Sequence, residues 1–195
     1  SAKMKKILAY IPKEDLNLPT LTVRETLEFS LNLRSPASMP AKLRRDRINV
    51  VLSLLGLSHV ADTIVGDQMI RGISGGEKRR VSLGVELVVG RSLLLASQPT
   101  NGLDSSAAYD VIKATRALSD TGLAAFMATV SQPSPELLAL FDTVCMVSRG
   151  TCIYFGPTAE AQRFFAQAGF VCPPHKAVSD FLEELTGDAE QFRKE

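Results

Sequence analysis

Three short apolar runs along the chain have the composition of β-strands. Residues 7–11, 93–96 and 124–130 are short apolar stretches, and the last two are continuous, which suits strands buried on both faces of a parallel sheet. Helical periodicity over 105–118 predicts a helix between the second and third runs. This order is a strand–helix–strand unit, so the pattern indicates an α/β fold.

The stretch between the first two strands has the pattern of helices. Thr22 with Glu25, and Ser74 with Glu77, have the spacing of capping boxes, in which the two residues satisfy free amides at a helix start. Gly56 stands where a helix C-terminus favours glycine. Three helices are therefore expected here: 23–33, 41–55 and 75–89.

A hairpin and three helices are expected in the C-terminal part. The strands 143–147 and 151–155 are joined by a turn at Arg149-Gly150. Cys145 and Cys152 could face each other across this hairpin. The expected helices cover 135–141, 159–168 and 178–185.

Composition and charge exclude several functional classes. The 195 residues are 45% hydrophobic and carry a net charge of +1, which is ordinary for a globular domain and gives no nucleic-acid footprint. The basic clusters at 42–47 and 78–80 are interpreted as solvated helix faces. No apolar run approaches the roughly 20 residues of a membrane helix. The three cysteines lack metal-type spacing, which favours reduced thiols in a cytosolic setting.

The run Ser74-Gly75-Gly76-Glu77 predicts an anion site at the start of a helix. Free amides and a partial positive charge gather at a helix N-terminus, and two glycines allow a phosphate to approach the backbone closely. The alternative interpretation of the four residues alone is an ordinary capped surface helix.

Several motifs, in this order, resemble those of ATP-binding cassette (ABC) transporters. Residues 73–82, Ile-Ser-Gly-Gly-Glu-Lys-Arg-Arg-Val-Ser, resemble the family's signature sequence. Residues 99–106, Pro-Thr-Asn-Gly-Leu-Asp-Ser-Ser, resemble the segment that runs from the end of the Walker B strand into the D-loop. Further segments resemble the white and pleiotropic-drug-resistance branch: 10–15, 21–27, 132–136 and 172–182.

The resemblance implies a P-loop NTPase-like (RecA-like) parallel sheet with an inserted all-helical signature subdomain. It places 1–195 in one partial nucleotide-binding domain, with the helical subdomain at 13–91 and the α/β core and C-terminal helices at 1–12 and 92–195. The sequence contains no Gly-x-x-x-x-Gly-Lys-(Ser/Thr) phosphate loop, the Walker A motif. We therefore expect the chain to be N-terminally incomplete, with that loop upstream.

The catalytic positions that the resemblance identifies carry other residues. Ser97 stands at the Walker B aspartate position, which helps to hold Mg²⁺, and Gln98 stands at the position of the glutamate that polarises water. Lys13 occupies the Q-loop position and Ser131 the switch-histidine position. The resemblance therefore implies a degenerate catalytic site, whereas Ser97 and Gln98 without their flanking motifs would be a polar strand end. Lys13 either replaces some Mg²⁺ charge or is a solvated surface lysine.

Other residues match those that one ABC cassette contributes to its partner cassette. ABC cassettes dimerise head to tail, so the resemblance implies that Ser74, Gly75, Gly76 and Glu77 bind nucleotide in the partner's site. Asp104 either contributes to the D-loop contact across the dimer or caps the helix at 105–118.

The resemblance implies part of an ATP-driven efflux transporter at the cytoplasmic face of a membrane. Its ligands would be ATP and Mg²⁺, and its partners a second ABC cassette and transmembrane domains of the same polypeptide, with no nucleic acid. This chain alone is expected to be inactive as an ATPase. The alternatives are a non-hydrolysing structural or regulatory cassette, a soluble non-transport ABC ATPase, and a gene product without function.

Overall fold

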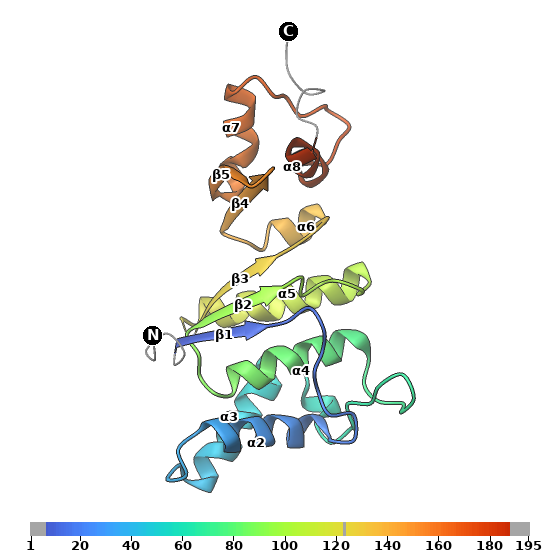
Figure 1. Ribbon diagram of the computed structural model, residues 1–195, viewed down its shortest axis with the longest axis vertical. Helices are drawn as coiled ribbons and strands as arrows, with labels where there is room; N and C mark the ends of the chain where they lie inside the picture. The colour runs from blue at the N-terminus through green and yellow to red at the C-terminus, as the bar shows by residue number, and fades with distance from the viewer. Residues whose placement is uncertain (1–6, 123, 188–195) are drawn as a thin grey trace. The chain divides into compact units, whose positions relative to one another are not determined.

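A three-stranded parallel sheet lies at the centre of the first of two units in the chain (Figure 1). The computed structural model describes residues 7–122 and 124–187, and the units divide after Val130. The sheet has the order β1-β2-β3, with β1 (Leu8–Ile11), β2 (Leu93–Ser97) and β3 (Ala125–Thr129). The expected parallel arrangement of the three apolar runs is therefore confirmed.

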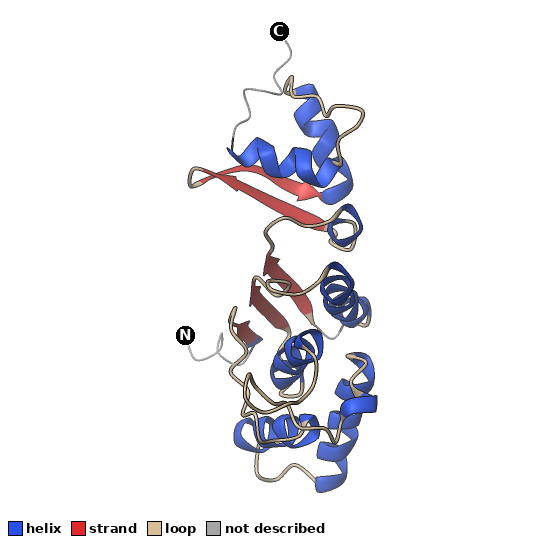
Figure 2. Ribbon diagram, turned by 90° about the vertical axis from the view of Figure 1, so that its right-hand side faces the viewer, coloured by secondary structure: helices blue, strands red, loops and turns tan. Residues whose placement is uncertain are grey.

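Helices cover one face of this sheet (Figure 2). α4 (Gly75–Leu87) packs against β1, and α5 (Ser105–Asp120) packs against β3. The side chains beneath them are buried: Ala9, Ile11, Leu94 and Ala96. α5 also connects β2 to β3, so the predicted strand–helix–strand unit is confirmed.

The opposite face of the sheet is more exposed. Tyr10, Leu95 and Met127 stand side by side in the strand register, and Tyr10 is 60% and Met127 62% exposed. The expectation that the apolar runs are buried on both faces is therefore wrong for the described residues. The apolar content of these strands exceeds what the described helices cover.

Two further helices pack beside α4 in the first unit, α2 (Val23–Arg34) and α3 (Ala41–Leu54), and the short 3₁₀ helix η1 (Ser58–Val60) packs beside α3. Both predicted capping boxes are present, at the starts of α2 and α4. A Cβ on Gly84 would lie 3.0 Å from both Leu27 Cδ2 and Leu55 Cδ1. A small residue there lets α4 approach its neighbours closely. Gly56 follows α3 and has a left-handed φ of 64°, which fits the predicted end of that helix.

The loop that leads into α4 closes tightly on itself. A Cβ on Gly72 would lie 2.2 Å from the Val65 carbonyl oxygen, a distance at which only glycine fits. The next residue, Ile73, is buried, and its amide donates to the Val65 carbonyl at 3.2 Å. This backbone closure holds Ser74 at the start of the helix.

The second unit contains an antiparallel hairpin and short helices. The hairpin strands are β4 (Thr143–Ser148) and β5 (Thr151–Pro157). The helical elements are α6 (Pro135–Leu138), η2 (Thr158–Glu160), α7 (Ala161–Gln167) and α8 (Val178–Gly187). Their core includes Met146, Tyr154, Phe165, Phe181 and Leu185.

Two expected helices of this unit are shorter than predicted. The helix expected over 135–141 ends at Leu138, because the chain continues in turns in which Leu140 and Phe141 bond only three residues back. The helix expected over 159–168 begins as the 3₁₀ turn η2. Over 7–122 and 124–187, the structure contains no helix with the length and apolar character required to span a bilayer.

Candidate functional site

The start of α4 has backbone amides without a helical hydrogen-bond partner. Ser74 caps the helix, since its Oγ accepts from the Glu77 amide at 3.3 Å, while the Ser74 amide and hydroxyl each donate to Glu77 Oε2 at 2.8 Å. Gly75 and Gly76 precede the first backbone bond of the helix, which the Lys78 amide makes to the Ser74 carbonyl at 2.9 Å. Ser74 and Gly75 are exposed. The capped, partly exposed helix start is the arrangement that the predicted anion site requires.

The two glycines at this helix start have different surroundings. A Cβ on Gly75 would meet only Leu103 Cδ2, at an ordinary 3.7 Å. A Cβ on Gly76 would lie 3.0 Å from Ala107 Cβ on α5. Gly76 therefore allows α4 and α5 to pack closely, whereas a substitution of Gly75 leaves the packing intact and changes the solvent-facing surface.

Glu77 is held by both of its carboxylate oxygens. Oε2 serves the capping box, and Oε1 lies 3.0 Å from His59 Nε2. Burial of Glu77 opposes its ionisation, but the hydrogen bonds from Ser74 and His59 outweigh this effect, so the pKa of Glu77 lies below its ordinary value of 4.5. The His59 side chain is 65% exposed, and its contact with Glu77 was not predicted from the sequence.

The end of β2 lies at the carboxyl edge of the sheet. Ser97 is the last residue of the strand, and Gln98 follows with a φ of 45°, a region that few residues other than glycine adopt. The Gln98 amide donates to the Thr129 carbonyl at 3.0 Å and lies 3.1 Å from Thr129 Oγ1. Both Ser97 and Gln98 are half-buried. The structure therefore places them where the sequence predicted, at an edge where α/β proteins bind ligands.

Arg79 connects α4 to two loops at this edge. Its side chain is 4% exposed. Nη1 donates to the Pro12 carbonyl at 2.7 Å and to Asp15 Oδ1 at 3.1 Å. Nη2 donates to the Ser97 carbonyl at 3.0 Å, and Nε donates to the Pro99 carbonyl at 3.2 Å. One guanidinium thus fixes the loop after β1, the end of β2 and the signature helix together.

The burial of Arg79 corrects a prediction from the sequence. The basic cluster 78–80 was expected to be a solvated helix face, which is wrong for Arg79. Its partners are carbonyls and a carboxylate distant in sequence, and these compensate for the lost hydration. The sequence did contain a signal for this burial, because Gly76, Arg79 and Leu83 have the spacing of one helix face, and all three are buried.

The loop that carries Lys13 is held on both sides of that residue. Arg79 binds Pro12 before it and Asp15 after it, and Lys13 itself is exposed. The structure therefore brings the Q-loop position close to the end of β2, with Arg79 between them. Ser131, at the switch-histidine position, is the first residue of the second unit and is exposed.

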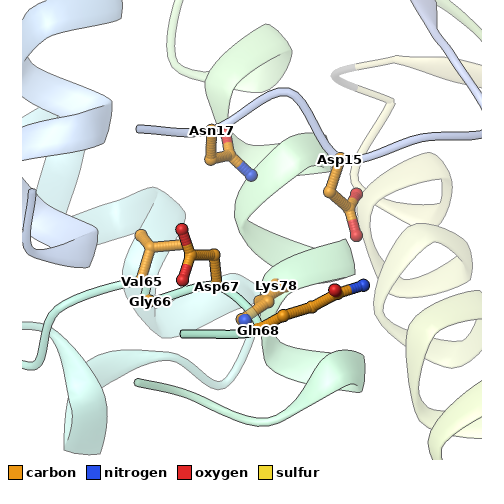
Figure 3. A pocket seen from close by; sticks show the side chains of 7 residues that line it. All are labelled: Asp15, Asn17, Val65, Gly66, Asp67, Gln68 and Lys78. Atoms are coloured by element: carbon orange, nitrogen blue, oxygen red, sulfur yellow. The ribbon is translucent and has the colours of Figure 1, made fainter. Parts of the chain in front are cut away.

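A pocket of about 230 Å³ lies beside α4 (Figure 3). Figure 3 shows Asp15 and Asn17 on one side and Asp67 and Gln68 on the other. The Ser82 hydroxyl donates to Asp15 Oδ1 at 2.7 Å and accepts from Asn17 Nδ2 at 2.9 Å. The pocket is small for a nucleotide, and two carboxylates outnumber the one cation in its lining, Lys78, so we do not assign a phosphate site to it.

Asp104 caps α5. Its Oδ2 accepts from the Ala107 amide at 3.4 Å, and its side chain is exposed. Of the two roles weighed for Asp104, helix capping is therefore present in this chain. Over the described residues, no cluster of three or more His, Cys, Asp or Glu side chains could hold a metal ion.

Replacement of Arg79 by Lys is expected to destabilise the first unit. An ammonium cannot reach four acceptors spread over two loops, so buried carbonyls lose their partners. We expect the free energy of unfolding in urea to fall by about 2–3 kcal/mol. Arg24→Lys is the matched control, since the Arg24–Asp62 pair is exposed and contributes about 0–1 kcal/mol. Equal effects of the two substitutions would contradict the role assigned to Arg79.

Glu77→Gln should make stability less dependent on pH in the acid range. The folded-state pKa of Glu77 is lowered, so its ionised form stabilises the fold above pH 4.5, and this contribution is lost as pH falls through the folded-state value. Glutamine retains the capping geometry without the charge. We expect the variant to be less stable than wild type by about 0.5–1 kcal/mol at neutral pH. The difference should vanish at low pH in urea titrations, and a constant difference at every pH would contradict this prediction.

Comparison with known proteins extends these observations. A family model described as "ABC transporter" matches residues 1–101. ABC transporter G family member 11 of Arabidopsis thaliana is 42% identical over 186 residues, which are 95% of this chain and 26% of that protein. ABC transporter G family member 5 of Dictyostelium discoideum is 37% identical over 185 residues, 95% of this chain and 12% of that protein. The chain thus spans about a quarter of the first relative and about an eighth of the second.

A solved structure has the same fold. The chain matches cbiO1 from Clostridium perfringens, described as part of the ABC transporter complex cbiONQ, with a TM-score of 0.67. The match covers 86% of this chain and 62% of cbiO1 at 20% identity, which supports the fold alone. The P-loop NTPase-like sheet expected from the sequence is thereby confirmed. Because the family model matches more than half of its 195 residues, the chain belongs to the ABC transporter family.

Proposed function

We propose that the chain is part of the nucleotide-binding domain of an ATP-driven membrane efflux transporter and supplies its signature motif to a partner cassette. The observation that carries the proposal is an asymmetry within one unit. At the start of α4, Ser74 and Gly75 are exposed and Gly76 is buried against α5, whereas the nearby sheet edge ends in Ser97 and Gln98. The helix start that would bind an anion is present. Ser97 and Gln98 stand at the positions where the family has the carboxylates that hold Mg²⁺ and polarise water.

The signature residues serve the second cassette in this proposal. In a head-to-tail dimer, Ser74, Gly75 and Gly76 face the terminal phosphate of ATP bound to the partner, with Glu77 orienting Ser74. The Ser74 hydroxyl, which donates to Glu77 in this chain, turns toward the phosphate on binding. Asp104 contributes to the contact between the two cassettes in addition to capping α5.

The chain's own catalytic site is degenerate in this proposal. Ser97 at the metal position and Gln98 at the glutamate position carry no negative charge, so they provide neither the anionic metal ligand nor the general base that carboxylates would supply. Lys13 and Ser131 stand at the Q-loop and switch-histidine positions. ATP and Mg²⁺ are therefore ligands of the dimeric transporter, and this chain alone binds them weakly or not at all.

The exposed sheet face supports the proposal that more of the cassette exists outside these 195 residues. Parallel sheets are normally covered on both faces. Tyr10, Leu95 and Met127 form an apolar row without a helix over it in the described unit. We infer that a helix of the same cassette, following an upstream phosphate loop, packs on this row, and that the helical subdomain at 13–91 and the core at 1–12 and 92–195 belong to one domain.

The further assignments follow the motifs and the relatives. The cassette belongs to the white and pleiotropic-drug-resistance branch and works at the cytoplasmic face of a membrane, joined to transmembrane domains of the same polypeptide. The relatives are named as transporters, which speaks against a soluble non-transport ATPase. A non-hydrolysing regulatory cassette is the second candidate, and the uncharged side chains of Ser97 and Gln98 favour it.

Two substitutions in the assembled transporter distinguish the two candidate functions of the cassette: Gly75→Asp and Gln98→Ala. Gly75 is exposed with room for a side chain, and an acidic residue in the first turn suits the helix dipole, so Gly75→Asp should fold normally. Its carboxylate repels phosphate, and we expect vanadate-sensitive ATPase activity in membranes to fall roughly 10²-fold. Gln98→Ala should change the activity by no more than a few fold.

Gly75→Ala at matched expression is the control, because it adds a methyl group without charge. If Gln98→Ala reduced the ATPase activity as much as Gly75→Asp, the degenerate site would have a working role and the proposal would fail. If Gly75→Asp had no effect on the ATPase activity, the regulatory alternative would be favoured.

A further inference from the structure

The β4–β5 hairpin contains an irregularity that changes which side chains share a face. Met146 pairs with Tyr154, and the next pair is Val147 with Cys152. Ile153 therefore has no partner in the register, which is the arrangement of a β-bulge. Without the bulge, strict alternation would put Cys152 on the same face as Tyr154, which lies in the core of the second unit.

The bulge instead puts Cys152 on the outer face of the hairpin with Cys145. The inner face is occupied by Val144 and Met146 of β4 and by Ile153 and Tyr154 of β5, which all pack in the core. Both cysteines are exposed, and their sulfur atoms lie 3.6 Å apart. Two accessible thiols are therefore in contact across the strands.

We propose that Cys145 and Cys152 form a dithiol site that small disulfides, such as oxidised glutathione, oxidise reversibly to an intramolecular disulfide. A disulfide has an S–S length of about 2.05 Å, so side-chain rotation and a small shift of the hairpin must bring the sulfurs together. The site is independent of the nucleotide chemistry proposed above, since all of its residues lie on β4 and β5.

The exchange takes place in two steps. The thiolate of one cysteine attacks a sulfur of oxidised glutathione, forming a mixed disulfide and releasing one glutathione thiolate. The second cysteine, as thiolate, then attacks the protein sulfur of the mixed disulfide, forming the Cys145–Cys152 bond and releasing the second glutathione. The protein loses two electrons and two protons, and oxidised glutathione is reduced to two glutathione molecules.

Cys172 is an internal control for this reaction. It is half-buried, packs against the core of the second unit, and its sulfur lies 3.7 Å from the Lys176 carbonyl oxygen. Burial raises the pKa of the Cys172 thiol. The hydrogen bond to Cys152 raises the pKa of Cys145 as well, so a mildly alkaline buffer supplies thiolate. What distinguishes Cys145 from Cys172 is a second thiol in contact with it.

The test uses the purified 195-residue chain and oxidised glutathione. Reduced chain is incubated with the oxidant, the remaining thiols are alkylated, and the products are analysed by intact mass and peptide mapping. We expect the number of free thiols to fall from three to one, with a loss of two hydrogens and a Cys145–Cys152 linked peptide. Dithiothreitol should restore all three thiols.

Two variants make the outcome decisive. Cys152→Ser removes the resolving thiol, so the adduct of glutathione on Cys145 should persist, whereas Cys172→Ser should leave the two-thiol loss unchanged. Stable glutathione adducts on wild type, a disulfide between two chains, or oxidation of Cys172 at the same rate as the pair would each overturn the proposal. Circular dichroism confirms that the variants remain folded.

Discussion

The arrangement of the first unit depends on one buried cation. Arg79 places its guanidinium among the Pro12, Ser97 and Pro99 carbonyls and the Asp15 carboxylate. Burial of a charge is costly unless hydrogen bonds and an opposite charge compensate for it, so these four contacts must all form together. Arg79 lies on the same helix as Ser74, a little more than one turn away. Because Ser74 caps the helix that carries Arg79, the contacts of Arg79 at the sheet edge also fix the position of the exposed helix end.

The contacts of Arg79 also determine how the start of α4 is oriented. A helix N-terminus alone is common, but this one is oriented against two loops at the carboxyl edge of a parallel sheet. The charge of Glu77 stabilises the helix and also opposes an incoming anion. His59 Nε2 lies 3.0 Å from the other oxygen of the same carboxylate. The exposed helix end is thus supported from within the chain, while Ser97 and Gln98 at the end of β2 carry no carboxylate.

Local signals in the sequence predicted most of the fold. Both capping boxes, the apolar strands and the turn at Gly56 depend on neighbouring residues, so spacing alone revealed them. Long-range features were missed for the opposite reason. Arg79 has partners 64 and 67 residues away, and the bulge at Ile153 is defined only by pairing between strands. The exposure of Tyr10 and Met127 depends on which helices cover the sheet, and strand composition does not encode this.

The central claim is that the start of α4 is an anion site supported within this chain. The most direct measurement is titration of the ¹⁵N-labelled 195-residue chain with inorganic triphosphate, followed through the amide chemical shifts of wild type and Gly75→Asp. We expect weak binding, in which the largest shifts occur at Gly75, Gly76 and Glu77, and we expect the substitution to abolish them. Larger shifts at Lys13 or Gln98 than at the helix start, or the same shifts in Gly75→Asp, would contradict the account.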